Sequence, residues 1–219
     1  ARTPSPALIA ELAAQQATLP DSAARGRALE TLGRPGTAAV VTGQQVGLFL
    51  GPLYTIYKAA TAVALAEALA VETGTPVVPI FWMATEDHDF AEIDHCTVAR
   101  GAELPLRLRV GGDGRSESRE PVAETLLGAD VAAAADALRE AIAGRPAGAE
   151  VAALLGEHYR PGRRFSEAFA GVLASLFADQ GLLVFHPRTP AVAQLAAPVY
   201  RPALARAGEI AERLAARAA

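Results

Sequence analysis

Three short apolar runs organise the central part of the chain. They cover residues 38–42, 77–83 and 182–185, and the longer two contain almost no polar residue. Continuous apolar runs of this length are typical of strands that are buried on both faces of a parallel sheet. Between the first two runs a helical pattern opens at Gly51-Pro52 and continues to about Val71. Strand, helix and strand in this order predict a βαβ unit with a right-handed crossover.

The segment that follows the second run has a different periodicity. From Ile93 to Val110, leucines alternate with polar residues, which predicts a β insertion or hairpin. A glycine-rich turn over 111–114 closes it. Helical periodicity then recurs in three further segments, which are residues 130–143, 148–158 and 164–179.

The sequence patterns at both ends of the chain predict helices. We expect a helical segment over residues 1–35, an α/β core over 36–190 with an insertion at about 93–160, and the start of a helical region over 191–219. Pro198 and Pro202 interrupt that last region. Because its apolar stripe is thin, we expect the helix from about Pro202 to Ala219 to extend from the core with few contacts.

Composition narrows the classes of function. Alanine fills 51 of the 219 positions, and Lys58 is the one lysine among 20 basic residues. The net charge is −4 and the arginines are scattered, so we expect no nucleic-acid partner. The single cysteine, Cys96, cannot form an internal disulfide, and the first residues lack a signal-peptide pattern. The apolar stretch 53–70 holds too much alanine for a membrane span. These features predict a cytoplasmic protein without a membrane partner.

The loop between the first predicted strand and the following helix is the first candidate site. Thr42, Gly43, Gln44, Gln45 and Gly51 lie in it. Ligands of open α/β sheets collect at the carboxyl ends of strands, and the start of the next helix favours an anion. The glycine spacing matches neither the dinucleotide fingerprint nor the phosphate loop, so glycines that only permit a tight crossover remain the alternative.

Lys58 strengthens the assignment of a ligand to this loop. It lies about six residues into the helix, or roughly 9 Å along the axis, and helical side chains lean back toward the N-terminus. Its ammonium can therefore return to the mouth of the loop, and Tyr54 and Thr61 share its helix face. A solvated surface lysine is the alternative.

An acidic loop directly follows the second apolar run, which ends at Trp82-Met83. Glu86, Asp87, His88 and Asp89 cannot all be buried without partners, because desolvating each ion costs several kcal/mol. They must meet water, a cation or a substrate amine. The spacing of Asp89 and Glu92 also fits a capping box for a short helix through Asp94. Both polar loops should be neighbours at the carboxyl edge of the sheet.

Several other residues are weaker candidates. A cysteine without a second metal-type spacing is more often a small buried hydrophobe, and arginines before a helix can face solvent or a carboxylate ligand. A histidine that follows a strand occupies a possible site position. This group comprises His95, Cys96, His158 with Tyr159, Arg163 with Arg164, and His186.

Long blocks of the sequence resemble a known family. Residues 42–49, 51–59 and 79–90, and the stretch from Phe165 to Val184, resemble the BshC family of cysteine ligases in bacillithiol synthesis. The resemblance covers most of this chain but only the N-terminal portion of the family's length. It implies a Rossmann-like parallel sheet with flanking helices, similar to the cores of class I aminoacyl-tRNA synthetases and nucleotidylyl transferases. It also implies a homodimer through a long coiled coil that these residues could only begin.

The resemblance further implies a reaction. Cysteine would be added to glucosaminyl-malate by an amide bond, with ATP, accompanied by Mg²⁺, activating the carboxylate as an acyl adenylate or acyl phosphate. Lys58 would offset developing negative charge, while Asp87, His88 or Asp89 would deprotonate the sugar amine. Substrate binding would involve Thr42, Gly43, Gln44, Gln45, Gly51, Tyr54, Trp82 and Glu86. No resident metal is expected, and we expect these 219 residues alone to lack ligase activity.

Two other classes of function stay open at this point. A metal-dependent hydrolase would use the cluster from Glu86 to Asp89 with Asp94 or His95 as ligands. A noncatalytic nucleotide-binding or assembly module would use the same fold without the chemistry.

Overall fold

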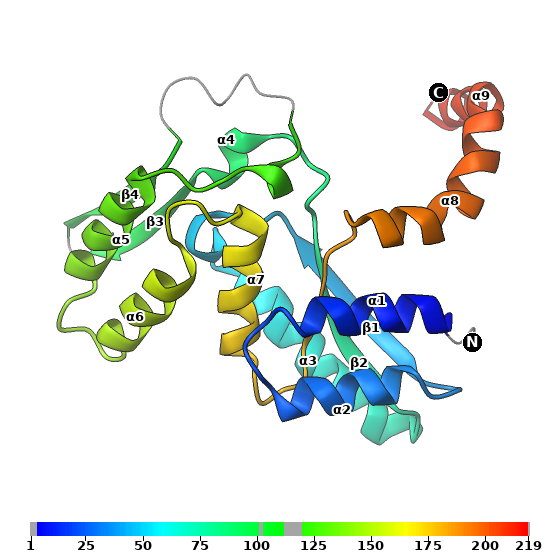
Figure 1. Cartoon of the computed structure of the whole chain (residues 1–219), viewed down its shortest axis with the longest axis horizontal. Coiled ribbons are helices and arrows are strands. Elements are labelled where there is room, and N and C mark those ends of the chain that lie inside the picture. Colours follow the sequence, from blue (N-terminus) through cyan, green and yellow to red (C-terminus); the bar gives the residue numbers. More distant parts are fainter. Residues whose placement is uncertain (1–3, 101–102, 112–119, 219) are drawn as a thin grey trace.

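The computed structural model describes residues 4–100, 103–111 and 120–218. Its centre is a parallel sheet of β1 (Ala38–Gln44), β2 (Val77–Met83) and β5 (Leu183–Phe185), in the order β1-β2-β5 (Figure 1). Thr42 is aligned with Phe81, and Phe81 with Val184. The three predicted strands are confirmed, but β1 runs to Gln44, so Gly43 and Gln44 belong to the strand and not to the loop.

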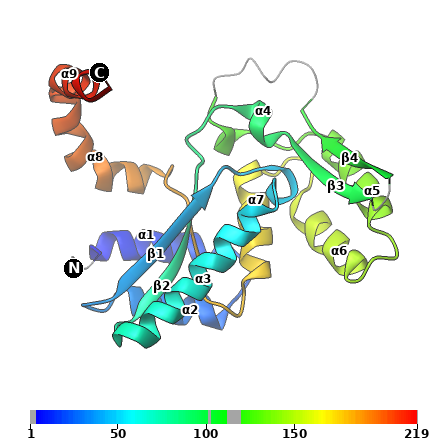
Figure 2. The same cartoon turned by 180° about the vertical axis from the view of Figure 1, so that it is seen from behind.

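Helices cover both faces of this sheet. α3 (Tyr54–Thr73) and α7 (Phe165–Leu176) pack on one face, and α1 (Pro6–Gln16) with α2 (Ala23–Leu32) on the other (Figures 1 and 2). Side chains of β2 alternate between the layers: Phe81 joins the core cluster of α3 and α7, while Val78 joins that of α1 and α2. The fold is therefore the expected Rossmann-like α/β arrangement.

The helix limits differ slightly from the prediction. α3 begins at Tyr54 rather than at Gly51, because Gly51 to Leu53 form a turn in which Thr55 N donates to Pro52 O. This turn places proline before the helix instead of inside its first turn. α7 and α5 (Asp130–Ala141) are shorter at their C-terminal ends than predicted, whereas α6 (Gly148–His158) has the predicted limits.

Two side chains of α1 bind the outer edge of β5. The Gln16 amide donates to Val184 O at 2.7 Å and accepts from Val184 N at 3.1 Å. The Gln15 amide makes the same pair of bonds with His186, at 3.0 and 2.9 Å. In a strand, the N–H and C=O of one residue point to the same edge, and those of the next residue point to the opposite edge. The N–H and C=O groups of Val184 and His186 therefore face away from β2. The end of α1 thus takes the place of a neighbouring strand.

The insertion between β2 and β5 contains the predicted hairpin. β3 (His95–Arg100) pairs antiparallel with β4 (Glu103–Arg109), and α5 and α6 pack beside it. Most of the predicted turn at 111–114 lies outside the described residues. The short helices α4 (Phe90–Ile93) and η3 (Val122–Glu124) join this part to the sheet. One continuous apolar cluster runs from the α3 face of the sheet into the hairpin, so the insertion shares the core of the sheet.

The C-terminal helices leave the core. α8 (Pro190–Ala205) contacts α1, and α9 (Ala207–Ala218) contacts α8 (Figure 1). Val192 at the start of α8 packs on the core, but most described side chains further along are exposed. Pro198 and Pro202 lie inside α8, where each removes a backbone donor. The expectation of an extended terminal helix with few contacts is confirmed for residues 202–218.

The expectation that alanine excludes residues 53–70 as a membrane span is wrong by composition alone, because α3 is long and apolar enough to cross a membrane. In the fold it lies along β1 and β2, and its buried positions include Ala59, Val63 and Ala66. Its apolar face therefore contributes to the core of the α/β domain.

We predict that Gly171→Ala destabilises the protein. A Cβ at this position of α7 would lie 2.6 Å from Cε1 of the buried His158, and closely packed rings cannot absorb such an overlap without shifting. The free energy of unfolding in urea should fall by about 1–3 kcal/mol. Gly156→Ala in α6 is the control, because a Cβ there meets no atom within 4 Å, and it should be neutral or mildly stabilising. Equal stability of the two variants would contradict this packing.

Candidate functional site

The two polar loops meet at the carboxyl ends of β1 and β2. Gln45 Nε2 donates to Asp87 Oδ2 at 3.1 Å and also to Glu92 Oε2. The backbone joins them as well, since Ala84 N donates to Gln44 O at 2.9 Å. The expected proximity of the loops is confirmed, and Gln45 is the side chain that links them.

The loop after β1 has an unusual backbone. Phe49 and Leu50 have φ values of 51° and 70°, and Gly51 follows with 64°. Left-handed conformations cost energy for residues that carry a side chain, so the surroundings must hold them. A Cβ on Gly47 would lie 2.9 Å from the Cα of Gly51, which requires glycine where the loop closes on itself. Gly51 therefore has a conformational role in the loop.

Tyr159 holds this loop from the insertion. Its hydroxyl donates to Gly47 O at 2.8 Å and accepts from Leu50 N at 3.1 Å. The residue is 2% exposed, and burial raises the pKa of the Tyr159 hydroxyl well above its usual value. The hydroxyl thus keeps the proton with which it donates to Gly47. Edge-to-face packing on Phe49, with ring centroids 5.0 Å apart, adds to the support.

Lys58 reaches back to the end of β1, as its position predicted. Its Nζ donates to Gly43 O at 3.2 Å and to Gln44 Oε1 at 2.9 Å, and it lies 5.2 Å from the centroid of the Tyr54 ring. Gln44 Nε2 in turn donates to the Tyr54 hydroxyl at 2.8 Å. The side chains of Lys58 and Tyr54 are exposed. Tyr54 borders a cavity of about 310 Å³, whose other lining residues are Gln44, Gln45, Gly47, Pro52, Glu92, Ile93 and His95.

Asp87 organises the acidic loop. Its Oδ1 accepts hydrogen bonds from the backbone N–H groups of His88, at 2.7 Å, and Asp89, at 3.1 Å. The bond from Asp89, followed by those from Gln45 and His88, lowers the pKa of Asp87, although partial burial opposes this. A carboxylate with a lowered pKa is a weak proton acceptor, so Asp87 is suited to hold a cation or an amine rather than to deprotonate one.

The other acidic-loop residues are open to solvent. Glu86, His88 and Asp89 are exposed beside Asp87, so they can meet an incoming ligand. Asp89 precedes α4, but its side chain forms no capping hydrogen bond with that helix. The capping-box interpretation of Asp89 is therefore wrong, and Glu92 bonds to Gln45 instead of reaching back to Asp89.

Two further predicted site residues lie apart from Lys58. Trp82 points to the face of the sheet covered by α1 and α2, where its ring packs edge to face on Phe185 at 4.8 Å, and it is 44% exposed. Thr42 lies half-buried on β1. Gly43 allows β1 to approach β2 closely, because a Cβ there would lie 2.6 Å from Trp82 O. The structure thus brings Lys58, Gln44, Gln45, Tyr54 and Asp87 together and leaves Trp82 on the opposite face.

The ligands of the alternative metal site have other partners. Asp94 is 2% exposed and contacts His95 Nδ1 at 2.8 Å and Arg109 Nε at 2.5 Å. Cys96 is buried, and desolvation raises its pKa to about 11, as expected for a structural thiol. Within residues 4–100, 103–111 and 120–218, no three His, Cys, Asp or Glu side chains converge on a common metal position.

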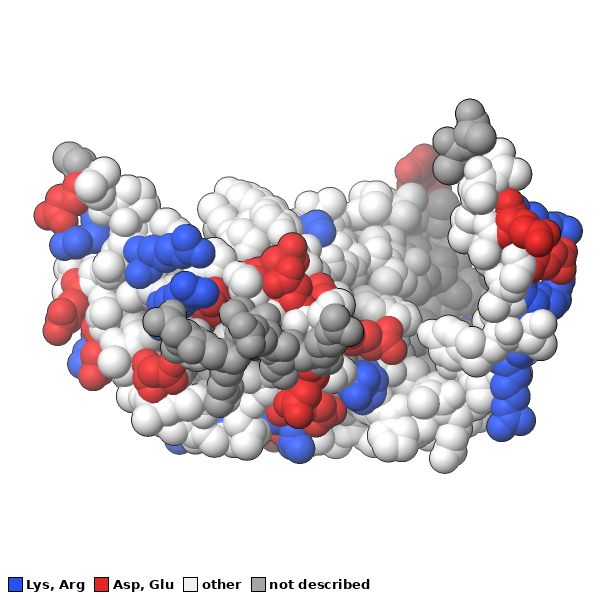
Figure 3. All heavy atoms as spheres, turned by 90° about the horizontal axis from the view of Figure 1, so that it is seen from above, with Lys and Arg blue, Asp and Glu red and all other residues white. Residues whose placement is uncertain are grey.

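The charged side chains of this region are mixed in sign. On the face that Figure 3 shows, acidic and basic side chains form small separate groups on a mostly uncharged surface, among the residues that the structure describes. A positively charged stripe is the usual footprint of a nucleic-acid binder.

Comparison with known proteins identifies relatives over nearly the whole chain. Residues 2–219 match a family model described as "Bacillithiol biosynthesis BshC, N-terminal Rossmann-like domain". A protein of Solibacter usitatus is 43% identical over 208 residues, which cover 95% of this chain and 37% of that protein. A protein of Salinibacter ruber is 41% identical over 79% of this chain and 31% of its own length. Both carry the name "Putative cysteine ligase BshC". This chain spans about a third of the length of these relatives.

We predict that Tyr159→Phe destabilises the protein by about 1–3 kcal/mol, because Leu50 N–H and Gly47 C=O are then left buried without this partner. Urea unfolding measures the change. Tyr57→Phe is the matched control, since Tyr57 is 64% exposed, and it should change stability by less than about 0.5 kcal/mol. An unfolding curve of the Tyr159 variant that overlays the wild type would rule out the clamp.

We predict that Asp87 makes stability depend on acid pH. The pKa of Asp87 is lowered in the folded state, so the charged carboxylate stabilises the fold above its unfolded pKa. This contribution is lost as the pH falls through the lower, folded pKa. Asp87→Asn should therefore reduce the unfolding free energy most near about pH 7, and the difference from wild type should shrink toward about pH 3. A difference that is constant across this range would contradict the shift.

Proposed function

The chain belongs to the BshC family as its N-terminal Rossmann-like domain, and from this premise we propose that it carries part of the active site of a ligase that joins cysteine to glucosaminyl-malate. The observation that supports this proposal most is the junction of Gln45 with Asp87 beside Lys58. It brings a cation, amide groups and a charged carboxylate to the carboxyl edge of a parallel sheet. Ligands of open α/β sheets bind at this edge.

Formation of an amide from a carboxylate sets the chemical requirements. The carboxylate must acquire a leaving group, and ATP, with Mg²⁺ bound to its phosphates, would supply it. Lys58 fits the negative charge of such a ligand, because its ammonium is exposed and bonds to two neutral oxygens, those of Gly43 and the Gln44 amide. The Gln44 amide is half-buried beside it. Lys58 would stabilise the charge that develops as the leaving group departs.

The acidic loop would receive the amine partner. Asp87 keeps its charge through the hydrogen bonds from Asp89 and His88, so it can hold an ammonium group in place. His88 and Asp89 are exposed next to it and are our candidates for the group that removes the proton before attack. Gln45 fixes the distance between this loop and the Lys58 side of the site.

We expect the activity in the whole protein. The chain spans about a third of the length of its relatives, so groups outside these 219 residues would contribute to binding, and these residues alone would lack ligase activity. The homodimer through a coiled coil and the cytoplasmic location also remain predictions.

Lys58→Ala in the whole protein tests the proposal. The rate of ATP-dependent joining of cysteine to glucosaminyl-malate should fall about a hundredfold or more, as for other groups that stabilise charge in a transition state. The free energy of unfolding should change little, because Lys58 is exposed. Thr61→Ala, one turn further along the same exposed face of α3, is the matched control and should keep normal turnover. Near-normal turnover of the Lys58 variant would refute the role.

A further inference from the structure

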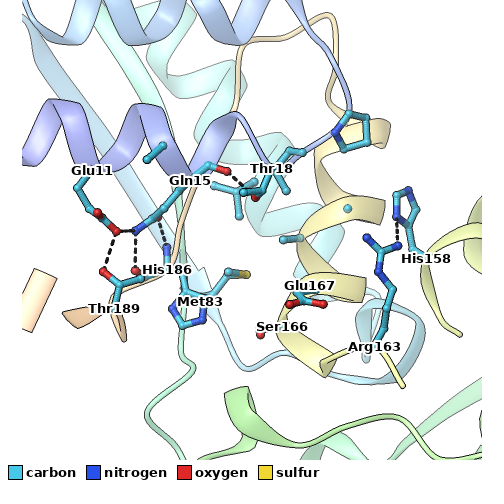
Figure 4. A pocket seen from close by; sticks show the side chains of 16 residues that line it. Glu11, Gln15, Thr18, Met83, His158, Arg163, Ser166, Glu167, His186 and Thr189 are labelled. Atoms are coloured by element: carbon cyan, nitrogen blue, oxygen red, sulfur yellow. Dashed lines mark hydrogen bonds between the residues drawn. The ribbon is translucent and has the colours of Figure 1, made fainter. Parts of the chain in front are cut away.

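A second cavity lies on the other side of the acidic loop, between α1 and α7. Its volume is about 380 Å³, and it opens at the carboxyl ends of β2 and β5 (Figure 4). Three residues that are weak candidates by sequence, His158, Arg163 and His186, all line it. His186 lies more than 20 residues after His158 and Arg163, and the fold brings it to the same cavity. Cavities of this size with a few convergent polar groups are typical of small-molecule sites.

Arg163 provides a cation at one end. Its side chain is half-buried, and Nη1 lies 3.4 Å from Nδ1 of the buried His158. Among the described residues its guanidinium forms no ion pair, in contrast to the neighbouring Arg164, which contacts Glu124 and Glu167. Burial is the largest cause that lowers the pKa of His158, which keeps the imidazole neutral and able to accept from Arg163. A half-buried guanidinium with spare donors selects a carboxylate or another planar anion.

Carboxylates face the same space. Glu167 lines the cavity near Arg163, and Glu11 lines the opposite end. Glu11 Oε1 accepts from Thr189 Oγ1 at 2.7 Å and from Gln15 Nε2 at 2.9 Å, and these bonds lower the pKa of Glu11. A cation and carboxylates around one small space fit a ligand that carries both charges.

Part of the cavity wall is apolar. Met83, Val184 and Ala170 line it, and all three are buried. Such a surface accepts a short apolar or sulfur-containing side chain. The thioether of Met83 adds a polarisable contact for such a group.

We propose that this cavity binds a small α-amino acid, with the carboxylate on Arg163, the ammonium on Glu167 and the side chain over Met83 and Ala170. The identification of that amino acid as L-cysteine rests on the proposed ligase function. The position suits this role, because Thr85 Oγ1 in the acidic loop lies 3.4 Å from Nδ1 of His186 at the cavity wall. The amino acid would thus lie on one side of the acidic loop, and the Lys58 site on the other.

Calorimetric titration of L-cysteine into the whole protein, without ATP or glucosaminyl-malate, tests the proposal. Arg163→Gln should weaken binding about tenfold or more, the loss expected when a charged hydrogen bond is removed. Arg160→Gln, an exposed arginine three residues earlier that does not line the cavity, is the matched control and should bind as the wild type does. Cysteamine, which lacks the carboxylate, should bind equally weakly to the wild type and to the Arg163 variant.

A second variant distinguishes loss of the binding site from loss of folding. Ala14→Phe on the exposed side of α1 would fill the mouth of the cavity without changing a charge, and it should abolish cysteine binding while the circular dichroism stays native. The proposal is overturned if the wild type does not bind L-cysteine or if Arg163→Gln binds it equally well. Because the titration measures no turnover, cysteine binding that depends on Arg163 would support the site even if the ligase reaction failed.

Discussion

The geometry of the Lys58 site depends on one buried hydroxyl. Tyr159 joins the end of the insertion to the loop after β1, where Phe49 and Leu50 adopt left-handed conformations. Strained residues of this kind persist only where neighbouring groups hold them. The insertion is thus part of the support of the site, and the continuous apolar cluster that joins it to the sheet has the same effect. Mutations in α6 that shift Tyr159 should therefore change the conformation at the end of β1, which is far away in the sequence.

Much of the architecture could be predicted because buried strands and helix faces have recognisable apolar patterns in the sequence. The apolar runs marked the three strands, and the lean of helical side chains brought Lys58 back to Gly43 and Gln44. The errors arose where a partner decides the outcome. β1 continues to Gln44 because β2 is there to pair with it. At α4 the backbone N–H of Glu92 donates to the Asp89 carbonyl, and the Glu92 carboxylate bonds to Gln45, so neither half of a capping box forms. Single-sequence periodicity does not contain these tertiary partners.

The residues that sequence reasoning passed over share a physical character. Glu11 and Gln15 look like the solvent side of an amphipathic helix. The interpretation of His158 and Tyr159 as surface groups at a helix end is wrong, because both side chains are buried against tertiary partners. Arg163 carried a weak signal, as an arginine beside a helix start, yet nothing in the sequence placed it with His186. One cavity lies at the end of β1 and the other at the ends of β2 and β5, which is a property of strand order in space.

The end of α1 also decides how this sheet can be enlarged. Gln15 and Gln16 each supply a donor and an acceptor to β5, a pairing that glutamate could not reproduce because a carboxylate has no donor. The outer edge of β5 is therefore closed at Val184 and His186, whereas β1 is an edge strand on which Val41 is 56% exposed. Exposed edges recruit further strands. Any added strand would lie beside β1, next to Lys58, so enlarging the sheet would at the same time build a new wall for the site.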